Sequence, residues 1–576
     1  RRRLGDFLGM PAGGAQPPDG ATSVPRAVAL RLALLGGGAG LLFGVDLGSI
    51  GGALQGMQED LGLVGPQVQM VVSAARAGAV FGCLLGGSLA TTWGRRAAIE
   101  MAVLPFFLGP LAVILCRGVY MAVFGRLVIG VGVGIATVST PLYLSEVSPP
   151  AIRGQLVSLF ELAIALGFLL AAYAVWVVEE YFAPCLFGCW RYQAGMIPLC
   201  MAVPLAFAVQ LVPESPRWLL SDSCKRPDKF VIALEAMLEV GRQGARERLR
   251  RVGRVDRTEG SDGELPGVGT EGSADDLVAL WDERHAAAGS PLWPDEKAAR
   301  GSGGAPPHQG ADGKTISDCT QVFAALGAQL RVIFDMASGA RELPAGTSRS
   351  LALAVIAATL NLACGSSALL VYGQMMIGSM GEHSKNVQDQ LALLLALAKL
   401  LGVVVGLAVV ESCDRRRLLG LGGASCLICL LVATVGAFAN LMPVVLGGIC
   451  GFLFSFFCSW GTATWVVVAE LTAGFGPKYG NASQAAATAM IFLAGGATEY
   501  VSPTVWEVFG DCGMLPYAAV CLCMILFSFL MLPETRGCSL QECTQRVISS
   551  SYNVVSVSYS DLESTDSDLE SSSGAP

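Results

Sequence analysis

The sequence predicts an all-α membrane protein with twelve transmembrane helices arranged as two six-helix halves. The 576-residue chain is 53% hydrophobic and only 15% charged, whereas a soluble globular chain carries about 25% charged residues. Its apolar residues form runs of about 20 positions, which is the length that a helix needs to cross a bilayer. The two halves of the chain also carry the same short motifs at corresponding positions, which indicates an internal repeat.

The apolar runs define the expected spans, and the short loops between them define the orientation. Lysine and arginine gather in every second loop, and such loops face the cytosol. We therefore expect both termini in the cytosol and the protein in a plasma or endosomal membrane. The expected spans are residues 27–53, 67–90, 97–116, 119–146, 154–178, 190–212, 350–378, 388–411, 417–439, 441–470, 482–509 and 513–532.

The segments outside the two halves differ from them in composition. The segment between the halves begins with a helical pattern at 228–251, and its Gly/Ser/Pro-rich part at 258–315 is expected to be disordered. The expected organisation is a cytosolic N-terminal tail (1–26), an N-terminal six-helix half (27–212), a cytosolic linker (213–349), a C-terminal six-helix half (350–532) and a cytosolic Ser/acidic tail (533–576).

Three motifs form the internal repeat. They follow the second, fourth and sixth spans of each half, and they are Gly94-Arg95-Arg96 with Asp414-Arg415-Arg416, Glu146 with Glu470, and Pro213-Glu214-Ser215-Pro216-Arg217 with Pro533-Glu534-Thr535-Arg536-Gly537. Parallel repeats related by an axis along the membrane normal are typical of transporters, whose substrate binds near the midplane between the halves. The repeat therefore favours a transporter over a channel or a receptor.

The loop motifs are similar to those of a known family. The most specific string is Pro141-Leu142-Tyr143-Leu144-Ser145-Glu146-Val147-Ser148-Pro149-Pro150-Ala151-Ile152-Arg153-Gly154, and Pro213-Glu214-Ser215-Pro216-Arg217-Trp218-Leu219 and Pro533-Glu534-Thr535 add to it. On these residues the chain resembles the sugar porters of the major facilitator superfamily, the glucose-transporter-like family. Glu161 and Lys399 look most like the class III branch. The resemblance implies the major facilitator fold and transport by alternating access.

The chain departs from the family pattern at several positions. Thr462 and Thr464 stand where the family carries prolines before Trp465, and Ala487-Thr488 stands where an Asn-Trp pair is expected. Thr91 and Thr92 replace an acidic residue and an arginine after the second span, and Asp414 replaces a glycine after the eighth. Several of these positions lie where the family holds its sugar or bends a helix, so they bear on the substrate more than on the fold.

Charged residues inside the spans are candidates for the transport mechanism, because an ionisable group there costs at least about 2.5 kcal/mol on insertion scales. Asp46 lies in the middle of the first span, and Arg126 in the fourth span can face it. The resemblance implies a proton-coupling pair, in which the carboxylate takes up a proton outside and releases it inside. The alternative is a permanent structural ion pair in a facilitator.

The expected substrate site combines charged, polar and aromatic side chains. Lys399 lies in the middle of the eighth span and can pair with Glu161 or with Glu499. A carboxylate at Glu161 can accept hydrogen bonds from sugar hydroxyls, and aromatic rings can stack on the apolar face of a pyranose. With the residues that the resemblance adds, the expected substrate-binding set is Phe43, Glu161, Asn361, Ser366, Ser367, Tyr372, Lys399 and Trp465.

Charged residues also mark the helix ends that are expected to face the cytosol. In the family such residues form salt bridges between the halves that favour the outward-open state. The alternative is that they set the topology and cap helices. The expected gating set is Arg95, Arg96, Glu146, Arg153, Glu214, Arg415, Arg416, Glu470 and Lys478.

Transport of a hexose or a related polyol is the leading functional expectation, with a small-molecule sugar and the lipid bilayer as partners and protons as a further partner if Asp46 couples them. The alternatives are a non-transporting sugar sensor and a porter of a non-sugar solute such as dehydroascorbate or inositol. No nucleophile–base arrangement, phosphate-binding loop or metal-ligand spacing is present, so we expect no enzyme activity, cofactor or metal site. The net charge of −8 does not indicate a nucleic-acid partner.

Overall fold

The computed structural model describes residues 26–147, 153–182, 189–219, 311–338, 346–379, 385–410, 412–472, 476–536 and 546–548. All the regular elements within these residues are helices. The first half contains α2 (Arg26–Leu61), α3 (Gly65–Thr92), α4 (Arg95–Ile114), α5 (Val119–Val147), α6 (Arg153–Val177), the π-helix Val178–Phe182, α7 (Cys189–Arg191), the π-helix Tyr192–Met196, α8 (Ile197–Gln210) and α9 (Pro216–Leu219). The remainder contains α13 (Ala311–Ser338), α14 (Thr347–Ala363), α15 (Ser366–Ser379), α16 (Lys385–Val410), α17 (Arg415–Phe438), α18 (Met442–Cys458), α19 (Trp460–Thr472), α20 (Gly476–Phe509), the 3₁₀-helix Gly510–Cys512 and α21 (Leu515–Leu530).

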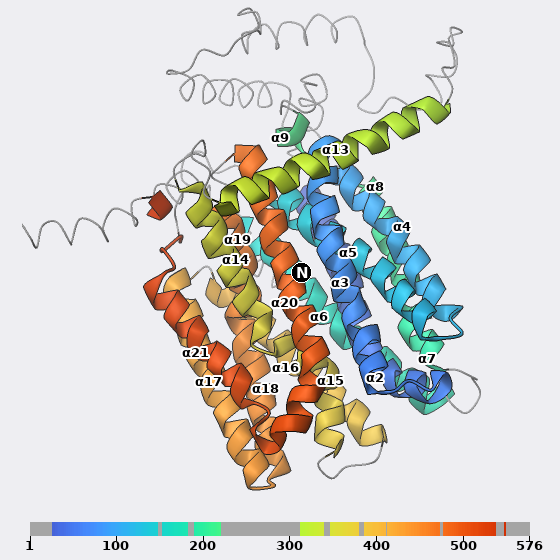
Figure 1. Cartoon of the computed structure of the whole chain (residues 1–576), viewed down its shortest axis with the longest axis vertical. Coiled ribbons are helices and arrows are strands. Elements are labelled where there is room, and N and C mark those ends of the chain that lie inside the picture. Colours follow the sequence, from blue (N-terminus) through green and yellow to red (C-terminus); the bar gives the residue numbers. More distant parts are fainter. Residues whose placement is uncertain are drawn as a thin grey trace, which may run out of the picture.

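These helices have the length and hydropathy of membrane spans. Within the described residues, ten helices or continuous helix runs are long and apolar enough to cross a bilayer, and α20 with α21 meets the criterion as a pair bent by 98°. Figure 1 shows α20 and α21 each running along the bundle, so every one of the twelve expected spans has a helical counterpart.

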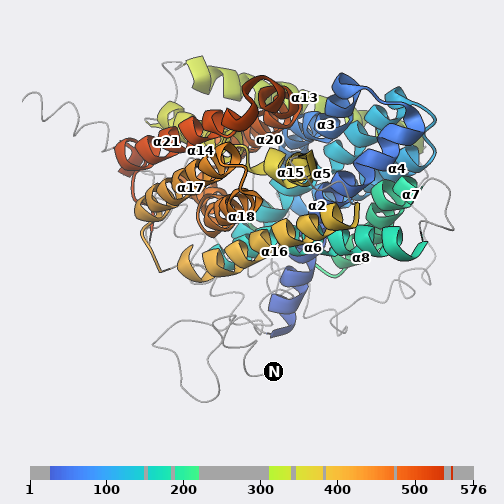
Figure 2. The same ribbon diagram turned by 90° about the horizontal axis from the view of Figure 1, so that it is seen from below.

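The helices form two groups that lie side by side. Figure 2 shows α2–α8 on one side and α14–α21 on the other, with α2, α6, α15 and α16 near the line where the groups meet. Glycines allow neighbouring helices of the first group to pack closely. A Cβ atom at Gly44 would lie 2.1 Å from the carbonyl oxygen of Ile164, and one at Gly130 would lie 2.0 Å from that of Ala75. Such close contact replaces the hydrophobic effect as the source of helix association in lipid.

Two expected spans are broken in the structure. The span predicted at 350–378 divides into α14 and α15 at Gly365, whose φ of +84° lies in the left-handed region that favours glycine. The span predicted at 441–470 divides into α18 and α19 at Ser459. Broken helices are typical of transporters at the depth where substrate binds.

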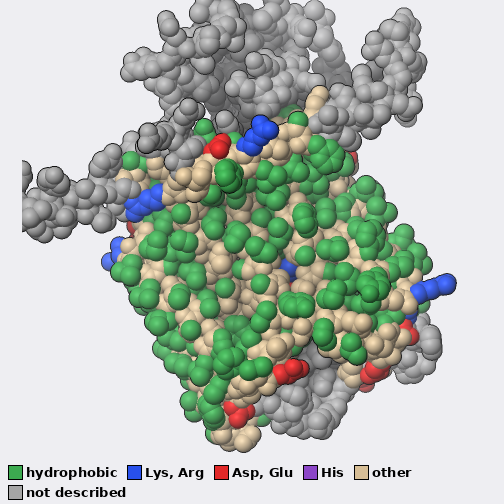
Figure 3. Space-filling view, in the orientation of Figure 1, with side chains coloured by type: hydrophobic (Ala, Val, Ile, Leu, Met, Phe, Trp, Pro, Cys, Tyr) green, Lys and Arg blue, Asp and Glu red, His purple; other side chains and the backbone are tan. Residues whose placement is uncertain are grey.

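The side of the bundle is apolar, and its charged residues gather toward the two ends. Figure 3 shows hydrophobic side chains covering this face between the charged ends. We call the end that carries Arg95, Arg96, Arg415 and Arg416 the basic end, and the opposite end, where α2 finishes, the Asp60 end.

Helix α13 lies across the basic end and touches both halves (Figure 1). Ser88 on α3 donates a hydrogen bond to Gln329 Oε1 at 2.8 Å. Met336 is buried with Leu351 on α14 and Ala482 on α20. α13 begins at Ala311, so residues 311–315, which were expected to be disordered, are helical. Further along the helix Val322 and Met336 are buried, a packing that composition alone does not reveal. The helix expected at 228–251 lies outside the described residues.

Candidate functional site

A cavity lies between the two halves near the middle of the bundle. The cavity has a volume of about 50 Å³, enough for a few water molecules. Both halves supply its walls, and the described lining residues are Phe43, Leu47, Arg76, Glu161, Ile164, Phe168, Asn361, Leu362, Ser366, Ser367, Leu370, Lys399, Phe456, Phe457, Gly461, Trp465, Ile491 and Phe492. The structure thus brings together seven of the eight expected substrate-binding residues.

Tyr372 is the expected substrate residue that does not line the cavity. Its ring packs edge-on against Trp506 with the centroids 6.2 Å apart. It follows the break at Gly365 by two helical turns, and this places it further along α15 than Ser366 and Ser367. Asn361 lines the cavity and also ties α14 to α19, because its amide donates to Thr464 Oγ1 at 2.8 Å.

Glu161 and Lys399 face each other across the cavity from opposite halves. Lys399 Nζ lies 3.8 Å from Glu161 Oε1, and both side chains are almost fully buried. The indole nitrogen of Trp465 donates to the other carboxylate oxygen of Glu161 at 3.1 Å. The Lys399 ammonium also lies 4.5 Å from the ring centroid of Phe457. Of the two partners expected for Lys399, the structure places Glu161 beside it.

Glu499 instead pairs with Arg76, a residue that the sequence analysis did not single out. Arg76 Nε lies 3.0 Å from Glu499 Oε1, and an Arg76 guanidinium nitrogen donates to Ser367 Oγ at 2.5 Å. The guanidinium lies between the rings of Phe43 and Phe492, at 5.6 and 5.7 Å from their centroids. Arg76 is the one charged residue in the apolar run 67–90, so the insertion cost that singled out Asp46 also applies to it.

Asp46 and Arg126 form a buried ion pair within the first half, between α2 and α5. A second, smaller cavity of about 10 Å³, room for about one water molecule, lies beside this pair. Phe43, Arg76 and Phe492 line both cavities, and Glu499 lines the second. Arg76 therefore separates the expected substrate site from the expected proton site.

The halves touch along the whole seam between α3 and α20. Gln69 donates to Thr504 Oγ1 at 3.4 Å near the Asp60 end, and Arg76 meets Glu499 at mid-depth. Asn481 donates to Thr91 Oγ1 at 3.4 Å at the basic end. The seam is thus closed on both sides of the cavity, which describes an occluded conformation along this seam.

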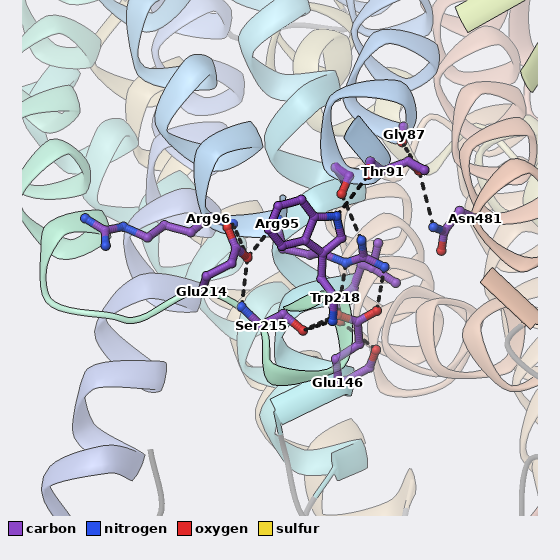
Figure 4. A network of polar contacts seen from close by, with 12 residues as sticks. Gly87, Thr91, Arg95, Arg96, Glu146, Glu214, Ser215, Trp218 and Asn481 are labelled. Carbon is purple, nitrogen blue, oxygen red and sulfur yellow. Dashed lines mark hydrogen bonds and ion pairs between the residues drawn. The ribbon is translucent and has the colours of Figure 1, made fainter. Parts of the chain in front are cut away.

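Four of the five expected gating residues of the first half, Arg95, Arg96, Glu146 and Glu214, lie in one network at the basic end (Figure 4). Arg95 donates to both carboxylate oxygens of Glu146, at 2.9 and 2.7 Å. The Glu214 carboxylate accepts the backbone N–H groups of Arg95 and Arg96 and so caps α4. Burial raises the pKa of Glu214, and its bonds from backbone N–H groups oppose that rise. The Arg96 side chain donates to Gln210 at 2.8 Å.

Gly94 is required at this turn. Its φ is +109°, and a Cβ atom there would lie 2.3 Å from the Glu214 carboxylate. A side chain would therefore strain the backbone and displace the cap.

The second half repeats the network. Glu534 accepts the backbone N–H groups of Arg415 and Arg416 at the start of α17, at 3.0 and 3.1 Å. Arg415 reaches Glu470 at 3.4 Å, and Thr535 donates to Glu470 at 2.6 Å, as Ser215 donates to Glu146 at 2.5 Å in the first half. The repeat read from the sequence is therefore also a repeat of contacts.

Two ion pairs of the gating set join helices of the same half, Arg95 with Glu146 and Arg415 with Glu470. The reason is geometric, because each carboxylate ends a helix that packs beside the arginine's own helix. The side chains of Arg153 and Lys478 lie outside the described part of the chain. Salt bridges between the halves therefore stay a prediction.

The chain matches a family model described as "Sugar (and other) transporter" over residues 33–236 and 336–546. It is similar to the probable metabolite transport protein CsbC of Bacillus subtilis, with 38% identity over 181 residues (31% of this chain and 38% of the relative). It is 40% identical over 210 residues to probable inositol transporter 2 of Arabidopsis thaliana (35% and 34%) and 33% identical over 215 residues to the galactose-proton symporter of Escherichia coli (37% and 44%). These alignments span less than half the length of each relative.

Solved structures agree on the fold. The proton:xylose symporter XylE bound to 6-bromo-6-deoxy-D-glucose superposes with a TM-score of 0.64 at 20% identity, covering 89% of this chain and 98% of that one. The inward-open conformation of XylE from E. coli gives a TM-score of 0.58 at 18% identity, covering 89% and 98%. With two repeated halves, broken helices beside a central cavity and a family match over most of its length, the chain belongs to the sugar porter family of the major facilitator superfamily.

Proposed function

We propose that the protein transports a hexose or a related polyol across a membrane by alternating access. The observation that carries this proposal is the cavity between the halves, to which both halves contribute polar side chains. A site built from two bodies changes its access when the bodies rock against each other, and substrates of such transporters bind there. Entry of a sugar requires the cavity to expand, because about 50 Å³ is far below the 300–1,000 Å³ that is usual for small-ligand sites.

Glu161, Lys399, Trp465 and Asn361 are the proposed polar contacts of the substrate. The Glu161 carboxylate and the Lys399 ammonium are complementary to hydroxyl donors and acceptors, and they lie within 4 Å of each other. Trp465 and Phe43 supply aromatic surface for the apolar face of a sugar ring. Tyr372 has no direct contact in this proposal, since it does not line the cavity.

Proton coupling through Asp46 is the second part of the proposal. The Asp46–Arg126 pair lines a water-sized cavity. Phe43, Arg76 and Phe492 line both this cavity and the substrate cavity. Two of the relatives are named galactose-proton and arabinose-proton symporters. Because Arg76 lines both cavities, a change in the substrate site reaches the Asp46 site through a side chain that the two sites share.

We also propose that the basic end faces the cytosol, with both termini and the 213–349 linker on that side, in a plasma or endosomal membrane. Arg95, Arg96, Arg415, Arg416 and Arg417 lie at this end, and short loops rich in arginine and lysine stay in the cytosol.

The test is uptake of labelled substrates into proteoliposomes, with and without an inward proton gradient. The panel contains hexoses, dehydroascorbate and myo-inositol, the last because several relatives are named inositol transporters. Asp46→Asn is the test variant, and Asp60→Asn is its matched control, because Asp60 lies on the same helix and is partly exposed.

Each outcome decides between named alternatives. Accumulation that needs the gradient and is lost in Asp46→Asn but kept in Asp60→Asn supports proton symport. Downhill uptake that ignores both pH and Asp46→Asn makes the Asp46–Arg126 pair structural and the protein a facilitator. No uptake of any panel member by folded protein would contradict transport and favour the sensor.

A further inference from the structure

A second large hollow lies on the outside of the C-terminal half, away from the central cavity. It is a groove of about 670 Å³ between the end of α16, the start of α17 and the last turns of α18. It shares no lining residue with the central cavity. Leu418, Leu421, Phe454 and Cys458 supply its apolar wall. Leu421 is 67% exposed and Phe454 is 37% exposed, so the groove opens on the apolar flank of the bundle.

Charge is concentrated at the mouth of the groove, at the basic end. Arg417 and Arg536 both lie beside one carboxylate, that of Asp414, at 3.4 and 3.5 Å. Two guanidinium groups and one carboxylate therefore line the mouth. The side chains are 77% exposed for Arg417 and 39% exposed for Arg536, so both can reach a ligand.

Hydroxyl groups lie deeper in the groove. Ser425 and Ser455 share a hydrogen bond at 2.8 Å, and both line the groove. Ser425 is ten residues along α17 from Arg415, which is about 15 Å below the basic end. The groove thus has an order from mouth to floor: cations first, then an apolar wall with hydroxyls set into it.

We propose that this groove binds an anionic phospholipid of the leaflet at the basic end. Its phosphate would lie between Arg417 and Arg536, where a planar guanidinium forms charge-assisted hydrogen bonds. Its acyl chain would lie along Leu421 and Phe454. Basic pockets between transmembrane helices at the cytosolic side bind anionic head groups in this way. Ser459, at the break between α18 and α19, also lines the groove. A bound lipid would therefore lie against the start of α19, the helix that contains Trp465.

The experiment uses the full-length purified protein, titrated with phosphatidylglycerol or with phosphatidylcholine of the same acyl chains and followed by native mass spectrometry. A photoreactive phosphatidylglycerol with a diazirine in its acyl chain then maps the contact. The test variant is Arg417→Gln with Arg536→Gln. The matched control is Arg117→Gln with Arg331→Gln, which removes the same charge from two exposed arginines elsewhere. Thermal unfolding checks that both variants are folded.

We expect wild-type protein to prefer phosphatidylglycerol and to cross-link it within 409–425 or 454–459. Each arginine near a membrane surface contributes about 1 kcal/mol to anionic lipid binding, so the test variant should bind about 30-fold more weakly and the control should not change. The proposal is overturned if the two lipids bind equally, if the test variant keeps the preference, or if the cross-links map elsewhere. It is also overturned if the acidic segment 561–573, added as a peptide, cross-links to the groove and lipid does not.

Discussion

Removing the positive charge of Arg76 should open the seam between the halves. Arg76 on α3 and Glu499 on α20 form an ion pair that crosses from one half to the other, and Arg76→Gln leaves Glu499 buried without its counter-charge. The reciprocal change, Glu499→Gln, leaves the Arg76 guanidinium buried without its counter-charge, between the faces of Phe43 and Phe492. Ser367 hydrogen-bonds both groups, so it remains as a partner in either variant. We therefore expect either single change to open the seam.

The size of the effect follows from burial. The side chains of Arg76 and Glu499 are 6% and 2% exposed and 3.0 Å apart, so water does not screen them in the closed seam. Breaking such a pair by removing one partner costs about 3–5 kcal/mol. Opening the seam hydrates the orphaned carboxylate and relieves the cost. A gain of about 3 kcal/mol for the open form shifts the open-to-closed ratio about 150-fold.

Hydrogen–deuterium exchange followed by mass spectrometry measures this shift without a probe attached to the protein. Arg76→Gln should raise exchange in peptides covering 65–78 and 498–510. Arg191→Gln is the control, because its pair with Asp60 is partly exposed and lies within the first half. Arg76→Gln combined with Glu499→Gln should exchange less than Arg76→Gln alone. Unchanged exchange in a folded Arg76→Gln protein would refute the view that this pair holds the seam closed.

Three further changes test other contacts. Lys399→Met should lower the free energy of unfolding by about 3 kcal/mol, because it strands the buried Glu161, and adding Glu161→Gln should recover most of that loss in thermal unfolding; equal losses in the single and double variants would contradict the pairing. Because burial raises the pKa of Glu214, the folded protein holds more protons than the unfolded chain between the ordinary and the raised value. Stability should therefore fall as pH rises through that interval, and Glu214→Gln should remove this part of the pH dependence of the melting temperature. Met336→Ala should cost about 2 kcal/mol of α13 docking and speed proteolysis within 311–338, whereas Phe334→Ala, which removes an exposed side chain of the same helix, should not.

The fold could be predicted from the sequence because the membrane restricts the choice of structure. Apolar runs of sufficient length can only be helices, and the repeated motifs fix the division into halves. The positions of Glu146, Glu214 and their counterparts Glu470 and Glu534 followed from the repeat. The partners of these carboxylates did not follow from the repeat. A motif shows at which helix end a charged residue lies, but it does not show which residue of a neighbouring helix that charge contacts. The structure describes Arg95–Glu146 and Arg415–Glu470 within each half, and the predicted salt bridges between the halves stay a prediction because the side chains of Arg153 and Lys478 are not described.

The cavity was predicted in part for a similar reason. The family resemblance located side chains on α2, α6, α14, α15, α16 and α19, and the cavity gathers seven of them. Arg76 lies on α3, where the resemblance assigned no substrate contact, and its importance depends on Glu499, which is 423 residues away. The breaks at Gly365 and Ser459 depend on contacts between helices, so hydropathy does not reveal them.

Three of the buried ion pairs lie at or beside the two cavities, and they differ in what rocking of the halves does to them. Asp46 and Arg126 belong to the same half, so their pairing can persist through the whole cycle. Arg76–Glu499 and Glu161–Lys399 each join opposite halves, so movement at the seams on which they lie separates them. When the carrier closes without substrate, these four charges would be buried at a cost of several kcal/mol each if they were unpaired. Pairing across the halves removes most of that cost, and it therefore lets the empty carrier close and return. A bound sugar must then compete with Lys399 for the Glu161 carboxylate, and with Glu161 for the Lys399 ammonium. Occupancy of the cavity is therefore linked to the contact between the halves.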